Sequence, residues 1–232
     1  RAEATYGASE QQVAAMTRRF YHLMACGLFL PNSPTLMNAG QPEGMLSACF
    51  VLPIEDSIEG IFDSVACTAR IQKAGGGTGF CFDSLRPTGD LAASSGGKTS
   101  GPISFWRVFA QTTEAIQQGA HRRGANMGMM SVEHPDILKF LYAKQDTSAF
   151  CNFNISVKVP DSFMSALHDR PNDPHVVMNP RNGLPYAIPK TVDLSGYAIQ
   201  DLWPAAQLCS PCYTRRDIWN MIVTNAHATG EP

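Results

Sequence analysis

The stretch LSACFVLPIEDSIEGIFDSVACTARIQKAGGGTGFCFDSLR, residues 46–86, decides the fold class. Its first seven residues, Leu46–Leu52, form an apolar run that predicts a buried strand. Asp56 stands three residues before Glu59 and apolar residues follow at helical spacing, so we expect a helix with Asp56 as its cap. A run of three glycines ends that helix, and a second strand is expected over residues 80–85.

Outside this stretch, helical and strand patterns alternate, which is typical of the α/β class. We expect helices over residues 9–28, 102–119, 136–143, 161–167 and 216–228, and a strand over residues 151–157. The segments rich in Gly, Pro, Asn, Ser or Thr are predicted to be loops, namely residues 31–44, 88–101, 119–128 and 170–196.

The composition excludes several function classes. The 232 residues are 44% hydrophobic and 16% charged, which indicates a folded core and not a disordered chain. A net charge of -2 gives no general attraction to nucleic acid polymers or anionic membranes. No apolar run reaches the ~20 residues that a membrane-spanning helix needs. The seven cysteines are odd in number and scattered, which favours a reducing compartment, so we expect a cytoplasmic protein.

Glycines and cations mark two candidate anion sites. Lys73, the Gly75–Gly79 run and Arg86 are placed to hold a phosphate, although glycine runs are more often simple turns. The pair Arg122 and Arg123 lies in a second glycine-flanked loop, which is either an anion site or a solvated surface turn.

The cysteines leave further alternatives open. Cys49 is either a small buried hydrophobe or a redox thiol held on a rigid strand. Cys209 and Cys212 form a CxxC pair, but a zinc site needs about four ligands. Because no second pair or spaced histidine accompanies them, we expect no metal site. The cysteines expected in the core are Cys26, Cys67, Cys81 and Cys151.

Several longer motifs occur in a fixed order along residues 30–168. They are NSPTLMNAG (32–40), LSACFV (46–51), DSI (56–58), KAGGGTGF (73–80), LRP (85–87), QG (118–119), RRGANMG (122–128), HPDI (134–137) and NFNIS (152–156). In this order they resemble the catalytic subunit of ribonucleotide reductases. The glycine run and the RRGANMG segment are more similar to the adenosylcobalamin-dependent class than to the di-iron class.

The resemblance implies a ribonucleoside-diphosphate reductase in which adenosylcobalamin starts thiyl-radical chemistry. It implies that Cys49 is the first cysteine of the pair that reduces the ribose. The positions it places near the substrate are Ser33, Ala48, Cys49, Gly75 and Gly76. Those it places at a deoxynucleoside triphosphate effector are Asp56, Ser57, Lys73 and Arg86. Loops 88–101 and 118–127 would set substrate specificity, the second one through Gln118 and Arg122.

The resemblance also implies an architecture and partners. Residues 31–232 would form the first part of a ten-stranded α/β barrel, after a helical segment over residues 1–30. The two long helices would pair with their copies as a four-helix bundle in a homodimer. A thioredoxin-like protein or a dithiol would restore the reducing cysteines, and the cobalamin contacts would lie mostly outside these residues.

Two departures from the family pattern limit what is expected. Gly119-Ala120-His121 stands where the family has Gly-Gly-Thr, so the second loop is expected to be less mobile. The Asn-x-Cys-x-Glu loop that carries the thiyl cysteine is absent, so we expect a fragment that is inactive alone. One rival interpretation is a di-iron reductase that needs a radical-delivering partner subunit. Another is a non-catalytic, nucleotide-binding regulatory module.

Overall fold

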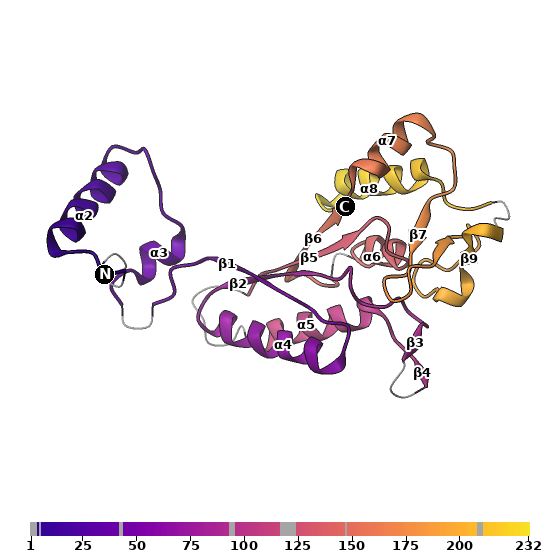
Figure 1. The fold of residues 1–232 in the computed structure, drawn as a ribbon, viewed down its shortest axis with the longest axis horizontal. Coiled ribbons are helices and arrows are strands. Elements are labelled where there is room, and N and C mark those ends of the chain that lie inside the picture. The colour runs from indigo at the N-terminus through magenta and orange to yellow at the C-terminus, as the bar shows by residue number, and fades with distance from the viewer. Residues whose placement is uncertain are drawn as a thin grey trace.

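The centre of the structure is a four-stranded parallel sheet with the strand order β1-β2-β5-β6. The computed structural model describes residues 4, 6–41, 44–92, 96–116, 124–146, 148–207 and 211–232. The strands are β1 (Cys49–Leu52), β2 (Gly77–Cys81), β5 (Asn126–Ser131) and β6 (Phe153–Lys158). Helices α4 (Ile58–Lys73) and α5 (Pro102–Ile116) run side by side along it (Figure 1). The predicted α/β class is confirmed.

The helix that joins β1 to β2 begins and ends for local reasons. Ser57, and not Asp56, caps α4, because the Ser57 hydroxyl accepts a hydrogen bond from the Gly60 amide at 3.0 Å. The Asp56 carboxylate instead accepts from the Arg86 guanidinium, so the predicted cap was wrong by one residue. At the other end, Gly75 follows with a φ of +90°, a conformation that favours glycine and stops the helix where it was expected.

Successive side chains of a strand point to opposite faces of a sheet, and the two faces here differ. The face that α4 and α5 cover is called the packed face. There Phe80 lies against Phe109 of α5 with ring centroids 4.4 Å apart, and Trp106 lies 5.6 Å from Phe153. All four rings are buried, so this face anchors the hydrophobic core.

The opposite face, here called the open face, lacks that cover. Cys49 and Val51 of β1 are exposed on it, and Val51 is 87% exposed. Gly77 and Gly79 of β2 follow in register, and Met127 of β5 borders them. The open face is therefore a shallow surface with bare backbone at its centre.

Three predictions about strands were wrong. The strand expected over residues 80–85 is β2, Gly77–Cys81, which begins inside the glycine run because pairing with β1 and β5 holds those glycines in a strand. The buried strand expected over residues 46–52 is the four-residue β1, whose alternate residues are exposed because it is an edge strand covered on one face. The loop expected over residues 119–128 already contains the start of β5 at Asn126. The sequence NMGMMS has no β-branched residue, so its strand conformation depends on pairing with β2 and β6 on either side.

The remaining elements surround this centre. They are α2 (Glu10–Ala25), α3 (Ser33–Asn38), β3 (Leu91–Ala92), β4 (Gly97–Lys98), α6 (Ile137–Tyr142), α7 (Asp161–Asp169), β7 (Val176–Met178), β8 (Pro185–Ala187), η1 (Ile199–Asp201), β9 (Trp203–Pro204), η2 (Ala205–Gln207) and α8 (Arg215–Thr229). The predicted helices are confirmed to within a few residues, as far as the chain is described. The loop predictions missed α3, the β3–β4 hairpin and the antiparallel β7-β8-β9 sheet.

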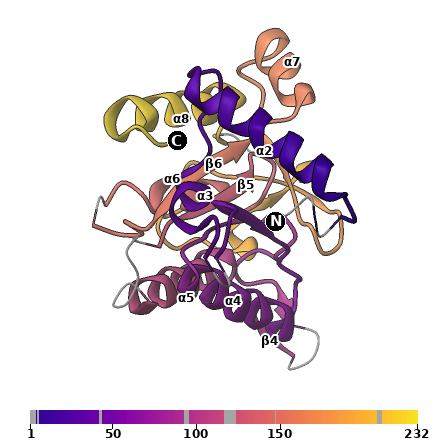
Figure 2. The same ribbon diagram turned by 90° about the vertical axis from the view of Figure 1, so that its left-hand side faces the viewer.

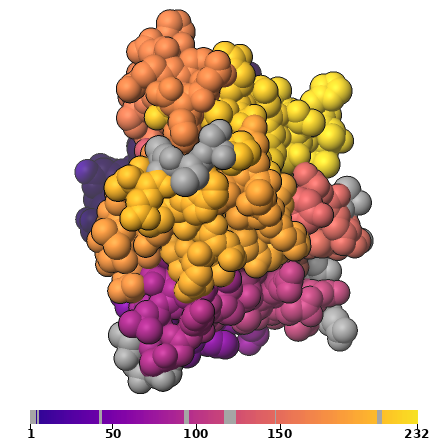
Figure 3. All heavy atoms as spheres, turned by 90° about the vertical axis from the view of Figure 1, so that its right-hand side faces the viewer, coloured from indigo at the N-terminus to yellow at the C-terminus, as the bar shows by residue number. Residues whose placement is uncertain are grey.

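The two ends of the chain take different positions. Helices α2 and α3 stand apart from the sheet, and α2 buries none of its residues (Figure 1). Seen from that side, α4 and α5 lie below the sheet and α7 and α8 above it (Figure 2). The opposite side is covered largely by the orange segment that contains β7, β8 and β9 (Figure 3).

The cysteines do not follow the prediction that four of them lie in the core. Cys26 and Cys151 are exposed, and Cys67 and Cys81 are only partly buried. Cys26 directly follows α2, which buries none of its residues. Cys151 lies at the surface, two residues before β6. Within the described residues, no helix is both long and apolar enough to cross a membrane.

Candidate functional site

A cavity of about 320 Å³ opens beside the first residues of β1, β2 and β5. Its size falls within the range of small-molecule sites in proteins. Four of the five predicted substrate positions line it, namely Ala48, Cys49, Gly75 and Gly76. The other lining residues are Phe50, Val51, Gln72, Gly77, Thr78, Gly79, Gly124, Ala125, Asn126, Met127 and Asn154. We refer to this space as the glycine cavity.

Cys49 is the first residue of β1 and is exposed at the wall of this cavity. It pairs in register with Gly77, and a Cβ added to Gly77 would lie 3.9 Å from the Cys49 Sγ. Of the two readings of Cys49, the buried hydrophobe is excluded. A strand fixes the direction of the thiol, so any ligand above Gly77 meets it at a defined position.

Gly76 shows why glycine is needed in this turn. A Cβ there would approach Phe50 to 3.0 Å, Met45 to 2.9 Å and Ile71 to 2.7 Å. The backbone of the turn is therefore packed closely between α4 and β1. Ser33, in contrast, is exposed on α3 and is not among the residues that line the cavity.

Asp56, Ser57 and Arg86 meet at the N-terminal end of α4. Arg86 Nε donates to Asp56 Oδ2 at 2.8 Å, and the Arg86 backbone amide donates to Asp56 Oδ1 at 3.2 Å. The Arg86 guanidinium also donates to the carbonyl oxygen of Leu91, in β3, at 2.8 Å. Both side chains of this pair remain partly exposed, so a ligand can reach them.

Lys73 does not join this cluster within one chain. It is the last residue of α4, fifteen residues after Ile58, and the helix separates the two ends by about 22 Å. The remaining two predicted positions, Gln118 and Arg122, lie outside the described residues.

The loop over residues 88–101 is held at its base by charged groups that sequence reasoning did not select. The Arg181 guanidinium donates to both Asp90 carboxylate oxygens at 2.7 Å and lowers the pKa of Asp90 to about 2. The buried Lys139 donates to the Thr88 hydroxyl at 2.6 Å and pairs with Asp136 at 2.8 Å. Burial lowers the pKa of Lys139, and the Asp136 carboxylate opposes that shift.

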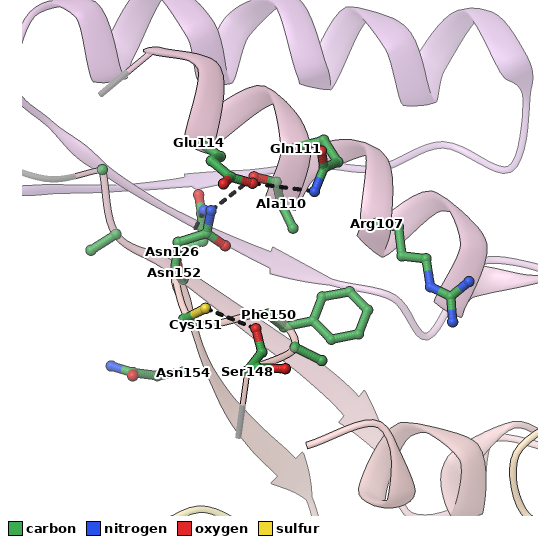
Figure 4. A pocket seen from close by; sticks show the side chains of 13 residues that line it. Arg107, Ala110, Gln111, Glu114, Asn126, Ser148, Phe150, Cys151, Asn152 and Asn154 are labelled. Carbon is green, nitrogen blue, oxygen red and sulfur yellow. Dashed lines mark hydrogen bonds between the residues drawn. The ribbon is translucent and has the colours of Figure 1, made fainter. Parts of the chain in front are cut away.

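A larger cavity of about 670 Å³ lies between α5 and the segment that leads into β6. Figure 4 shows Gln111 and Glu114 of α5 across from Cys151 and Asn152. Phe150, in its wall, has a φ of 53° and stacks on Trp106 at 3.8 Å, which offsets the strain of the left-handed backbone. Gly124, Ala125, Asn126 and Asn154 line both cavities. Among the described residues, no cluster of His, Cys, Asp and Glu is arranged to hold a metal ion.

Comparison with known families decides what kind of protein carries this site. The model of the ribonucleotide reductase barrel domain matches residues 47–232, and that of the ribonucleotide reductase all-alpha domain matches residues 2–44. The chain belongs to the ribonucleotide reductase family. The two matches meet between residues 44 and 47, whereas the sequence analysis places the end of its helical segment at residue 30.

Two relatives illustrate the likeness. A vitamin B12-dependent ribonucleoside-diphosphate reductase of Thermoplasma acidophilum is 52% identical over 165 residues, which are 70% of this chain and 21% of the relative. One of the same name from Mycobacterium tuberculosis strain H37Rv is 40% identical over 236 residues, covering 100% of this chain and 30% of the relative. The chain thus spans about a fifth to a third of the length of these relatives.

The fold also has a solved counterpart. The Actinobacillus ureae class Id ribonucleotide reductase alpha subunit matches with a TM-score of 0.67 at 23% identity, over 100% of this chain and 34% of that chain. At this identity the likeness concerns the fold alone. It agrees with the parallel strands β1, β2, β5 and β6 being part of the family's α/β barrel.

Several residues of the glycine cavity were missed by sequence reasoning. Gly79, Met127 and Asn154 lie in one row across the open face, because the strand registers pair Gly79 with Met127 and Met127 with Asn154. All three stand inside recognised motifs, so the motifs marked the region. The pairing of strands distant in sequence, which selects these positions, was not visible.

Proposed function

We propose that this chain is part of a vitamin B12-dependent reductase that converts ribonucleoside diphosphates to deoxyribonucleotides. The observation that carries the proposal is the exposed Cys49 thiol on β1, held at the wall of a cavity floored by glycine backbone. The names of the relatives at 52% and 40% identity support the reaction and the cofactor.

In this proposal Cys49 is one of two thiols that reduce the substrate. The ribose loses its 2′ hydroxyl as water, and the two thiols supply two electrons and two hydrogen atoms and become a disulfide. Cys151 cannot be the second thiol, because three strand spacings, about 14 Å, separate β1 from β6, and a disulfide needs Cα atoms about 4–7 Å apart. In this proposal the second thiol comes from another part of the full-length protein, and a dithiol or thioredoxin-like reductant regenerates the pair.

Adenosylcobalamin would supply the radical that starts the reaction. The glycine cavity, at about 320 Å³, suits a ligand of nucleoside size and not a corrin. What falls to this chain is to orient the sugar over Gly77 and to present the Cys49 thiol.

The pair of Asp56 and Arg86 is proposed as the specificity effector site. An Asp carboxylate accepts hydrogen bonds from a sugar hydroxyl, and a guanidinium binds phosphate. Because Arg86 also holds the Leu91 carbonyl, a triphosphate at this site would act directly on the loop over residues 88–101. Coupling of the two nucleotide sites through that loop is the proposed basis of dNTP control.

A homodimer would explain how Lys73 could take part in this site, although it lies far from Asp56 and Arg86 within one chain. Ile58 and Phe62 are exposed on α4, which leaves an apolar stripe for a helix of a second subunit. In an antiparallel pairing, the partner subunit's Lys73 would lie near the N-terminal end of α4 and could take an effector phosphate there.

The test is nucleotide reduction by the full-length protein, anaerobically with dithiothreitol, with and without adenosylcobalamin. Activity that requires the cobalamin is expected. Activity without it would support the di-iron alternative. Nucleotide binding without reduction in any condition would favour the regulatory module.

A further inference from the structure

Four uncharged polar side chains meet in the core at the inner wall of the glycine cavity, and three of them are among its lining residues. They come from four different elements, namely Gln72 of α4, Thr78 of β2, Thr113 of α5 and Asn126 of β5, and all are buried. We refer to them as the amide cluster. The surrounding packed face is otherwise aromatic and aliphatic, so a polar group of this size needs an explanation.

The hydrogen bonds of the cluster converge on Asn126. Its Oδ1 accepts from Gln72 Nε2 at 2.8 Å and from Thr78 Oγ1 at 2.6 Å. Its Nδ2 donates to Thr113 Oγ1 at 2.8 Å, and Gln72 Nε2 also lies 3.1 Å from the same hydroxyl. In this arrangement Asn126 Oδ1 accepts from two donors, and its Nδ2 donates to a hydroxyl that Gln72 shares.

The cluster connects the two walls of the glycine cavity. One wall is the turn after α4, where the Gly75 amide donates to the Gln72 carbonyl at 2.9 Å. The other wall is the start of β5, where a Cβ on Gly124 would lie 2.7 Å from Thr113 and 3.2 Å from Gln72 Oε1. Gln72 thus touches both walls, and its Oε1 has no hydrogen-bond partner in the described part of the chain.

A buried polar network of this kind holds one geometry more strictly than apolar packing does. Apolar side chains repack when a neighbour shifts, whereas each misplaced amide or hydroxyl here would leave a buried group without a partner. Backbone pairing of β2 with β5, in which the Thr78 amide donates to the Ala125 carbonyl at 3.1 Å, already joins the two walls. The side-chain hydrogen bonds further fix the position of the glycine turn relative to β5. The distance between that turn and β5 is the width of the cavity in which a nucleotide would lie.

We propose that the amide cluster, through Gln72, Thr113 and Asn126, sets the width of the glycine cavity and so acts as a positioning element for nucleobase selection. The inference rests on the proposed function only in taking the ligand to be a nucleotide. None of the three residues needs to contact the reacting atoms, since they act through the two walls.

The experiment compares two isosteric substitutions in the full-length protein. Thr113→Val removes the hydroxyl that Gln72 and Asn126 share. Thr68→Val is the matched control, because Thr68 is equally buried and lies one turn before Gln72, but its hydroxyl bonds only to the Ser64 carbonyl of its own helix. Thr113→Ser is the conservative variant, because serine keeps the hydroxyl. Dissociation constants for ADP and CDP are measured by calorimetry, a readout that needs no catalysis.

The ratio of the ADP and CDP dissociation constants should change by about tenfold in Thr113→Val, the equivalent of one hydrogen bond. It should stay at the wild-type value in Thr68→Val and return to it in Thr113→Ser. An unchanged ratio in Thr113→Val, or equal changes in both Val variants, would overturn the inference, as would a wild-type protein that binds neither nucleotide. A wild-type protein that binds ADP and CDP but reduces neither of them, with or without cobalamin, would contradict the proposed function. The role of the amide cluster would then still be decided by the ratio of the two dissociation constants.

Discussion

The packed face and the open face are built from alternate residues of the same four strands, yet they differ in every property that burial controls. On β2, Phe80 is 2% exposed beneath α5, while its neighbour Gly79 contributes bare backbone to a cavity. On β1, Val51 is 87% exposed. Parallel sheets normally bury both faces and carry continuous apolar runs. Under the proposed function, one face of this sheet serves stability and the other binds a ligand.

Replacing residues on the two faces should produce the largest contrast. Phe80→Ala removes a ring packed 4.4 Å from Phe109 and should lower the free energy of unfolding by about 3–5 kcal/mol. Val51→Ala should change it by no more than about 0.5 kcal/mol, because the side chain is largely in solvent. Urea unfolding of the full-length protein gives both values, and similar losses for the two variants would break the distinction between the faces.

Acid should lower the free energy of unfolding because His175 is buried in its neutral form. Burial lowers the pKa of His175 to about 4, from 6.5 in an unfolded chain. Between these values the unfolded chain binds a proton that the folded protein does not, so stability falls as the pH drops from about 6.5 to about 4. The expected loss is on the order of 3 kcal/mol.

Urea unfolding at several pH values measures this loss, with His168→Asn as the control because the His168 side chain is 90% exposed. The control should keep the wild-type pH dependence, whereas His175→Asn should reduce it to the part that comes from His134, whose pKa burial also lowers. A wild-type protein with pH-independent stability between about pH 6.5 and pH 4 would contradict the assignment of His175 as buried and neutral.

A smaller effect is expected at the N-terminal end of α4, where the charged side chains of Asp56 and Arg86 are partly exposed. Arg86→Ala removes a charge-assisted partner of a triphosphate and should weaken dNTP binding by about 1.5–3 kcal/mol. Equilibrium binding to the full-length protein measures it, with Arg18→Ala on the distant helix α2 as a control. Unchanged affinity in Arg86→Ala would remove Arg86 from the proposed effector site.

The sequence predicted the local features of this molecule better than the long-range ones. The limits of α4 follow from Ile58 to Lys73 at helical spacing and from Gly75, all within one stretch of chain. The exposure of Cys49 could not be predicted, because it depends on which face of β1 the helices cover. Likewise β5 lacks an intrinsic strand pattern, and Asn126 becomes a strand residue only between its partners in β2 and β6.

In the candidate site, too, the residues close together in the sequence were predicted better than the contacts between distant segments. Cys49, Gly75 and Gly76, which the motifs selected, line one cavity because one βαβ unit holds them. Lys73 stands in the same motif as Gly75 but lies a helix length from Asp56, a separation that the motif order does not reveal. The partners of Asn126 in the amide cluster come from up to 54 residues away, so sequence alone gave no sign of them.

The central claim, that the open face presents the reducing thiol, is tested most directly by Cys49→Ser in the full-length protein. Cys151→Ser is the matched control, because Cys151 is also exposed but lies at the far side of the sheet. Deoxynucleotide formation is measured anaerobically with adenosylcobalamin and dithiothreitol. Cys49→Ser is expected to abolish turnover with nucleotide binding retained, and Cys151→Ser to keep near wild-type turnover. Full turnover in Cys49→Ser would contradict the central claim.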